Sequence, residues 1–274
     1  APLIAIVPIS FSVSPFMVFT EGMLAWPPDP EAWSLRWYRN MIGDCSAEVV
    51  SSTVPCSTKW MKGTVNSFYI GIIATFIATV LGTMAALGLS RPHMPYKALI
   101  MSILISPMIV PLIITAAGMF FFYARINLVY TFTGVILAHV ALATPFVVIT
   151  VTATLVGFDM NMVKAAQSLG AKPMRTFFKV IMPLILPGII SGALFAFITS
   201  FDEVVIVMFM ASIDQLTIPK QMWAGIRQEI SPVILCMATC LVILSIVLLT
   251  TVESVSYTHL RAHETSLHLV CRLL

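Results

Sequence analysis

Two adjacent carboxylates, Asp202 and Glu203, lie inside a long apolar stretch of the sequence, residues 187–211. Charged side chains within a membrane segment are rare because they are costly in hydrocarbon, so they indicate a functional site by default. Two carboxylates suit a cationic substrate, whose ammonium groups need compensating charge once their water is removed. Because adjacent helical residues point about 100° apart, one carboxylate can face a substrate pathway while the other pairs with a neighbouring helix. The alternative is a structural carboxylate that pairs across a helix bundle.

The composition places this carboxylate pair in a membrane protein. Of the 274 residues, 59% are hydrophobic and only 10% are charged, and the mean hydropathy is +0.98. An ordinary globular domain contains about 25% charged residues. This difference excludes a soluble enzyme, a nucleic-acid-binding protein and a disordered regulator.

Six apolar stretches are each near the ~20 residues that a membrane-spanning helix needs. In lipid every backbone polar group must be satisfied within the segment, so each stretch is expected to be a helix. The sequence therefore predicts an all-α, polytopic membrane protein with about six transmembrane helices, the first truncated at its N-terminus. The stretches are 1–20, 64–89, 98–123, 132–156, 187–211 and 233–252.

The basic residues predict how these spans are oriented. Loops 90–97 and 157–186 hold six Lys and Arg residues against one acidic residue, whereas the loops on the other side of the membrane hold seven of each. The positive-inside tendency therefore places loops 90–97 and 157–186 in the cytoplasm.

Several spans carry residues that favour close packing or a bend. Small residues recur every four positions in the second stretch and predict a close approach by another helix. Prolines interrupt the third and fourth stretches, where each removes a helical hydrogen bond and favours a kink. The small residues are Ala74, Ala78, Gly82 and Ala86, and the prolines are Pro107, Pro111 and Pro145.

The loop 160–183, MNMVKAAQSLGAKPMRTFFKVIMP, has the pattern of two short helices. Good helix formers fill residues 160–169, and Gly170 suits a left-handed position at the C-terminus of a helix. Pro173 suits the first turn of a second short helix through Phe178. Pro183 and Pro187 then mark the return into the membrane.

This loop resembles the signature loop of the binding-protein-dependent ABC importer permeases, which reads E-A-A, three residues, G, nine residues, I, one residue, L-P. Ala165, Ala166, Gly170 and Pro183 match that pattern. Val180 and Met182 are conservative replacements for its isoleucine and leucine. Lys164 replaces its glutamate and reverses the charge.

The resemblance covers most of residues 1–253, and the segments SLRWYRN, FITSFDEVVIVMF and TIPKQMWAGIRQEISP are similar to the polyamine branch of these permeases. It implies a transport subunit of the bacterial inner membrane that imports a polyamine such as spermidine or putrescine by alternating access. The loop 160–183 would transmit the closure of a cytoplasmic ATPase dimer to the membrane helices. A second permease and a solute-binding protein are the other implied partners.

No enzymatic activity is expected of the chain itself. Nothing in the sequence resembles the phosphate-binding loop G-x-x-x-x-G-K-[ST], so a partner subunit must hold ATP and its Mg²⁺. No cofactor, metal or nucleic acid is expected to bind this chain.

Other readings stay open at this point. A secondary transporter driven by an ion gradient would use Asp202, Glu203 and His139 as a proton or sodium relay. A separate alternative for the loop 160–183 is an amphipathic surface helix that only anchors the loop. Trp223 and Arg227, in an outer loop, suit either the binding protein or the membrane interface.

Two features stand apart from the transport site. Cys45 and Cys56 share an outer loop in which a disulfide can form. Residues 254–274 no longer resemble the family, and we expect a non-native or disordered tail there, so His259 and His263 carry no metal prediction.

Overall fold

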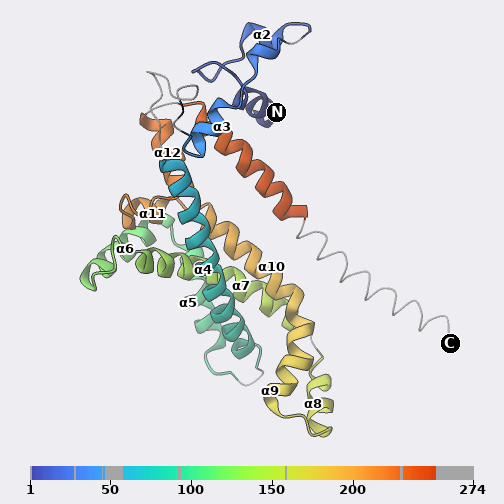
Figure 1. The fold of residues 1–274 in the computed structure, drawn as a ribbon. Helices are drawn as coiled ribbons and strands as arrows, with labels where there is room; N and C mark the ends of the chain where they lie inside the picture. Colours follow the sequence, from blue (N-terminus) through green and yellow to red (C-terminus); the bar gives the residue numbers. More distant parts are fainter. Residues whose placement is uncertain are drawn as a thin grey trace, which may run out of the picture. The chain divides into compact units, whose positions relative to one another are not determined.

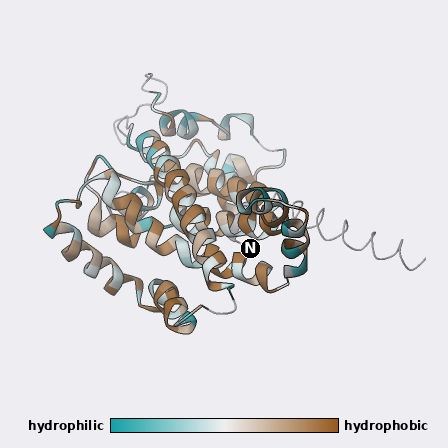
Figure 2. Ribbon diagram, turned by 90° about the horizontal axis from the view of Figure 1, so that it is seen from below, coloured by the Kyte–Doolittle hydropathy of each residue, from teal (hydrophilic) through white to brown (hydrophobic). Residues whose placement is uncertain are grey.

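The computed structural model describes residues 2–27, 29–44, 46, 58–91, 94–157, 159–228 and 231–250. These residues form helices and no strand; Ser12 and Trp33 make an isolated antiparallel bridge. The predicted all-α fold is confirmed, and hydrophobic residues predominate along the long helices (Figure 2). Within the described part, four helices are long and apolar enough to cross a membrane, and a bent pair of helices brings the number to five. The four helices are Lys59–Leu89, Phe132–Val156, Pro173–Phe201 and Val233–Thr250.

The chain forms two compact units. The first contains Ala1–Tyr69 and Ala211–Leu248, and the second contains Ile70–Met210. The elements of the first unit are α1 (Pro2–Ser10), α2 (Glu21–Leu24), the 3₁₀ turn η1 (Pro30–Ala32), α3 (Arg36–Met41), the start of α4 (Lys59–Leu89), α12 (Ile218–Gln228) and most of the helix Val233–Thr250.

The predicted first span, 1–20, is helical only over α1, and this expectation is corrected. Nine residues are about 14 Å long, roughly half of a ~30 Å hydrocarbon core. Beyond α1, the hydroxyls of Ser12 and Ser14 accept hydrogen bonds from backbone amides two residues later, at 3.2 and 3.1 Å. Such local bonds compete with the helix. The buried Trp37 also donates its indole N–H to the carbonyl of Ser12, at 2.8 Å.

In the same unit, polar side chains of α4 hold the segment that leads into α12. The Asn66 amide donates to the carbonyls of Asp214 and Leu216, at 2.8 and 2.9 Å. The Ser67 hydroxyl accepts from the Ile218 amide, at 2.9 Å. These bonds satisfy backbone groups before and at the start of α12, which explains how this loop keeps a fixed path.

The second unit is organised around α7 (Phe132–Val156), which is buried along much of its length and packs against α10 (Figure 1). The helix is continuous through Pro145. Its neighbours in the unit are the rest of α4, α5 (Lys97–Ile109), α6 (Leu112–Arg125), α8 (Met160–Ser168), α9 (Pro173–Thr176), the π-helical turn η2 (Phe177–Ile181), α10 (Met182–Phe201) and α11 (Val205–Met210).

The row of small residues on α4 lies at a close helix contact, as predicted. Ala74, Ala78 and Ala86 are fully buried. A Cβ atom added to Gly82 would lie 2.7 Å from the Cβ of Val147 on α7, closer than real Cβ contacts allow. The absence of a side chain at Gly82 therefore permits α4 and α7 to approach.

Glycines also bring α10 onto α7, a feature that the sequence analysis did not identify. A Cβ at Gly188 would collide with the side chain of Thr154, and one at Gly192 with the hydroxyl of Thr150. The Gly192 Cβ would also lie 3.1 Å from the backbone Cα of Val147. Small residues four apart are a frequent basis of helix pairing in membranes.

Replacing Gly192 with valine is expected to destabilise the protein by about 1–3 kcal/mol, because the added atoms must push α10 off the α7 backbone. Thermal unfolding in detergent, followed by size-exclusion chromatography, measures the loss. Gly118→Val in α6 is the matched control, since a Cβ there meets nothing within 4 Å. Equal stability of the two variants would contradict the packing argument.

Two helices of this unit are broken. The stretch 98–123 forms α5 and α6, which are bent by 103° at a break containing Val110 and Pro111. The predicted kink at Pro111 is confirmed. The predicted span 187–211 is corrected at both ends. The helix begins upstream at Pro173 and ends at Phe201, and the short α11 follows it.

Candidate functional site

The loop 160–183 begins with a capped helix. Asp159 is the N-cap of α8, and its carboxylate accepts a hydrogen bond from the Asn161 amide at 2.9 Å. Asp159 is the one acidic residue of the loop 157–186, and its role as a cap was not among the predictions. Its position directly before a run of helix formers is a signal for this role.

Gly170 ends this first helix as predicted. Its φ is +79°, in the left-handed region that favours glycine. The Gly170 amide donates to the carbonyl of Gln167 at 2.9 Å, and the Ala171 amide donates to that of Ala166 at 3.0 Å. This pair of bonds is a Schellman motif, which fixes the direction in which the chain leaves α8.

The second short helix is not separate from the membrane helix. Pro173 occupies the first turn of α9, as predicted, but α9, η2 and α10 form one 29-residue helix, Pro173–Phe201. Just before Pro183, the Met182 amide donates to the carbonyl of Phe177, five residues earlier. Pro183 has no amide hydrogen, and the helix widens there instead of ending. The segments α9 and α10 are therefore parts of one continuous helix.

The loop exposes large apolar side chains. Leu169, Met174 and Phe178 are 89%, 68% and 56% exposed. The other predicted positions have mixed exposure: Lys164, Ala165, Pro173 and Pro183 are exposed, whereas Ala166, Val180 and Met182 are half-buried. In the second unit α8 and α9 lie at the end of α10 that is far from α6 and α11 (Figure 1).

The carboxylate pair lies at the break between α10 and α11. Asp202 is the C-cap of α10, and its amide donates to the carbonyl of Ile198 at 3.0 Å. Glu203 and Val204 then connect to α11. The expectation that both carboxylates lie within one continuous helix is therefore corrected.

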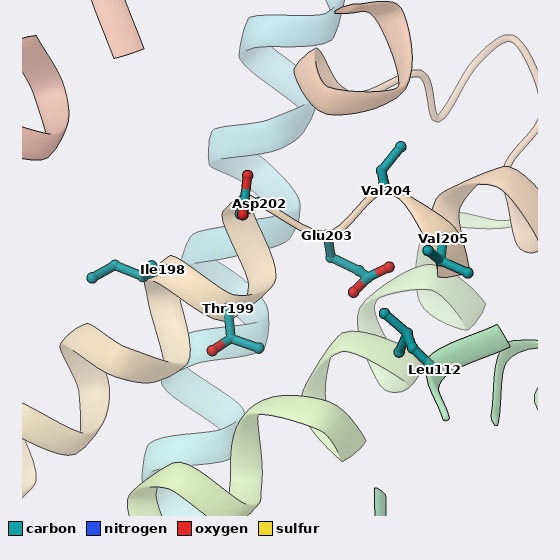
Figure 3. A pocket seen from close by; sticks show the side chains of 7 residues that line it. All are labelled: Leu112, Ile198, Thr199, Asp202, Glu203, Val204 and Val205. Atoms are coloured by element: carbon teal, nitrogen blue, oxygen red, sulfur yellow. The ribbon is translucent and has the colours of Figure 1, made fainter. Parts of the chain in front are cut away.

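The two carboxylates have different surroundings. Glu203 is only 7% exposed, and its carboxylate accepts from the Ile206 amide at 2.9 Å, which caps α11. Asp202 is exposed. Their side chains point in different directions (Figure 3). Glu203 is thus paired with the backbone of α11, and a place for Asp202 in a substrate pathway stays a prediction.

Asp202 and Glu203 line a pocket of about 380 Å³ (Figure 3). Leu112, the first residue of α6, also lines it, so the pocket lies where both broken helices are interrupted. Beyond the breaks, α6 packs against α11, and the Tyr130 amide donates to the carbonyl of Met210 at 2.9 Å. The remaining lining residues are Ile198, Thr199, Val204 and Val205.

The helix ends at this pocket favour a cation. The C-terminus of α10 is the negative end of its helix dipole, and Asp202 adds a carboxylate there. The positive N-terminus of α11 is already matched by Glu203. The open charge of the pocket is therefore that of Asp202.

A buried hydrogen bond joins α7 to the last turn of α10. The Nδ1 atom of His139 lies 2.8 Å from the hydroxyl of Ser200, and the two residues are 2% and 5% exposed. His139 does not line the pocket described above. Ser200, Thr199 and Leu112 were not among the predicted site residues, and none of them has a sequence motif of its own.

Some predicted features lie outside the described residues. They are Cys45, Cys56 and the segment 254–274 with His259 and His263.

The family model described as binding-protein-dependent transport system inner membrane component matches residues 78–261, more than half of the chain. The chain belongs to this family. The resemblance noted in the loop 160–183 is thereby confirmed, and the family with its apolar helices makes this permease a multi-pass membrane protein. The match favours a binding-protein-dependent transport system over a secondary transporter driven by an ion gradient.

Curated relatives extend the likeness over most of the permease. The chain is 27% identical over 225 residues to the spermidine/putrescine transport system permease protein PotC of Haemophilus influenzae, covering 82% of this chain and 81% of that protein. It is 28% identical over 246 residues to the putrescine transport system permease protein PotI of Escherichia coli K12, covering 87% and 79%.

A solved structure shares the fold. A bacterial ABC transporter involved in the import of the acidic polysaccharide alginate contains a chain that superimposes with a TM-score of 0.70. The match covers 92% of this chain and 89% of that one, at 15% sequence identity.

Proposed function

We propose that this chain is the permease subunit of an ATP-driven importer of polyamines, such as spermidine or putrescine, in the bacterial inner membrane. The observation that carries the proposal is the similarity to two polyamine permeases over about four fifths of each protein. The open carboxylate at a helix break supports the same substrate class, because broken helices form substrate sites in transporters.

In this proposal Asp202 binds an ammonium group of the substrate. The exposed carboxylate and the carbonyl end of α10 together supply the negative potential that a cation needs when it loses water. The methylene chain of a polyamine suits the apolar lining that Leu112, Val204 and Val205 provide. Glu203 holds α11 in place and does not contact substrate.

The loop 160–183 transmits the movement of a cytoplasmic ATPase dimer. Exposed Leu169 and Met174 supply apolar area for a groove on the ATPase, and the Schellman motif at Gly170 keeps α8 and α9 in a fixed arrangement. Since α9 continues into α10, closure of the ATPase displaces the helix whose far end carries Asp202. Lys164, where the family has glutamate, changes the charge that faces the groove.

The proposal also includes the orientation of the chain in the membrane and the partners with which it assembles. Loops 90–97 and 157–186 face the cytoplasm, where the ATPase subunits hold ATP and Mg²⁺. A second, homologous permease completes the pathway. A solute-binding protein delivers the substrate from outside, and the alternation between outward-open and inward-open states follows from the ligands on both sides.

Purification in mild detergent from the native host, with mass spectrometry of the co-purified proteins, tests the assembly. We expect an ATPase subunit and a second permease. The purified complex in proteoliposomes, with ATP inside and the solute-binding protein outside, is then expected to take up radiolabelled spermidine. Purification of the chain alone, with uptake driven by an ion gradient, would overturn the importer and favour a secondary transporter.

A further inference from the structure

The last turn of α10 needs an external constraint if Asp202 is to keep a fixed direction. Directly after Phe201 the helix stops, and residues at a helix end take part in fewer intrahelical hydrogen bonds than those at its centre. Helix ends therefore fray more easily than helix centres. The break between α10 and α11 contains no proline, the residue whose ring would restrict the backbone by itself.

The hydrogen bond between His139 and Ser200 supplies such a constraint. Ser200 lies two residues before Asp202, in the last turn of α10, and His139 lies on α7, the most buried helix of the unit. Both side chains are more than nine-tenths buried, so water does not compete for this bond. Among the described residues the other ring nitrogen, Nε2, has no hydrogen-bond partner. The Nδ1 atom is thus the polar contact of this ring.

We propose that His139 is a positioning residue that acts through Ser200 to hold Asp202 toward the pocket. This inference rests on the proposed role of Asp202 in binding substrate. The imidazole does not touch the substrate, and either tautomer serves: Nδ1–H can donate to the Ser200 hydroxyl, or Nδ1 can accept from it. His139 is fixed in the buried helix α7, and its bond to Ser200 holds the last turn of α10, which sets the direction of Asp202.

Substitutions at position 139 distinguish the effect of the Nδ1 hydrogen bond from the effect of side-chain volume. His139→Leu keeps volume but removes the bond, and we expect the KM for spermidine uptake by the whole transporter to rise about 10-fold, roughly the value of one hydrogen bond. His139→Asn places an amide near the Nδ1 position and restores the low KM. His139→Gln places its amide near Nε2 and does not. Equal KM values for the leucine, asparagine and glutamine variants would overturn the proposal.

A double-substitution cycle tests whether His139 acts through Ser200. Ser200→Ala alone is expected to raise the KM as His139→Leu does, and the double variant is expected to be no worse than either single variant. Additive effects would show that the two residues act separately, which contradicts the proposal.

A spectroscopic measurement does not depend on the substrate. In a chain whose five cysteines are replaced, a spin label at Asp202→Cys is expected to become more mobile when His139→Leu is added, and to stay restricted with His139→Asn. An unchanged spectrum would overturn the positioning role. If the label responds while the unsubstituted transporter takes up no spermidine, the positioning role stands and the polyamine assignment fails.

Discussion

Replacing Gly170 with valine is expected to lower uptake about 10-fold or more while ATP hydrolysis by the assembled transporter continues. Gly170 has a φ of +79°, and a left-handed conformation costs a residue with a Cβ atom about 1–2 kcal/mol. A Cβ at this position meets nothing within 4 Å, so the effect is one of backbone geometry and not of packing. The variant changes the angle between α8 and α9, and the long helices should fold as before. Uptake and ATP hydrolysis are measured in the same proteoliposomes.

Two controls accompany the Gly170 variant. Gly170→Asn should keep most of the uptake, because asparagine tolerates the left-handed region better than other residues with a side chain. Gly157→Ala, at the end of α7, has no positive φ to lose, and its Cβ makes only an ordinary contact of 3.8 Å. Normal uptake by Gly170→Val at normal expression would remove the loop from the transport mechanism.

The parts of this structure that the sequence predicted are those set by local chemistry. The left-handed position of Gly170 depends on the absence of a Cβ, and the break at Pro111 depends on a missing amide hydrogen. The close approach at Gly82 follows from the four-residue period of small side chains. Each of these properties is visible in one residue or one helix face.

The parts that the sequence did not predict depend on contacts between distant residues. Nothing between Thr199 and Val205 marks the end of α10, so the division of roles between Asp202 and Glu203 could not be assigned. The prediction of the first span was wrong for a related reason: the carbonyl of Ser12 accepts a hydrogen bond from Trp37, 25 residues away in the chain, and hydropathy does not reveal this contact. The prediction of a separate second short helix was wrong because a π-helical turn accommodates Pro183 without ending the helix.

Replacing Asp202 with asparagine is expected to raise the KM for spermidine uptake about 10- to 100-fold. The substitution keeps the shape of the side chain and removes its charge, and a hydrogen bond to a charged group is worth about 1.5–3 kcal/mol. Asp202 is exposed and forms the C-cap of α10 through its backbone, so the thermal stability of the protein should not change. Uptake kinetics with spermidine and unfolding in detergent are measured on the same preparations.

For Glu203 we expect an effect on stability and not on the KM, because its side chain is buried and caps α11 through the Ile206 amide. Glu203→Ala removes this cap and is expected to cost about 1 kcal/mol of stability. Glu203→Gln keeps an acceptor oxygen for the same amide, so its stability and its KM should stay close to those of the unsubstituted protein. If Glu203→Gln raises the KM while Asp202→Asn does not, the roles of the two carboxylates are reversed. Comparing the Asp202 and Glu203 variants therefore distinguishes a carboxylate that binds substrate from one that caps a helix. The sequence alone does not reveal this difference, because the two acidic residues are adjacent.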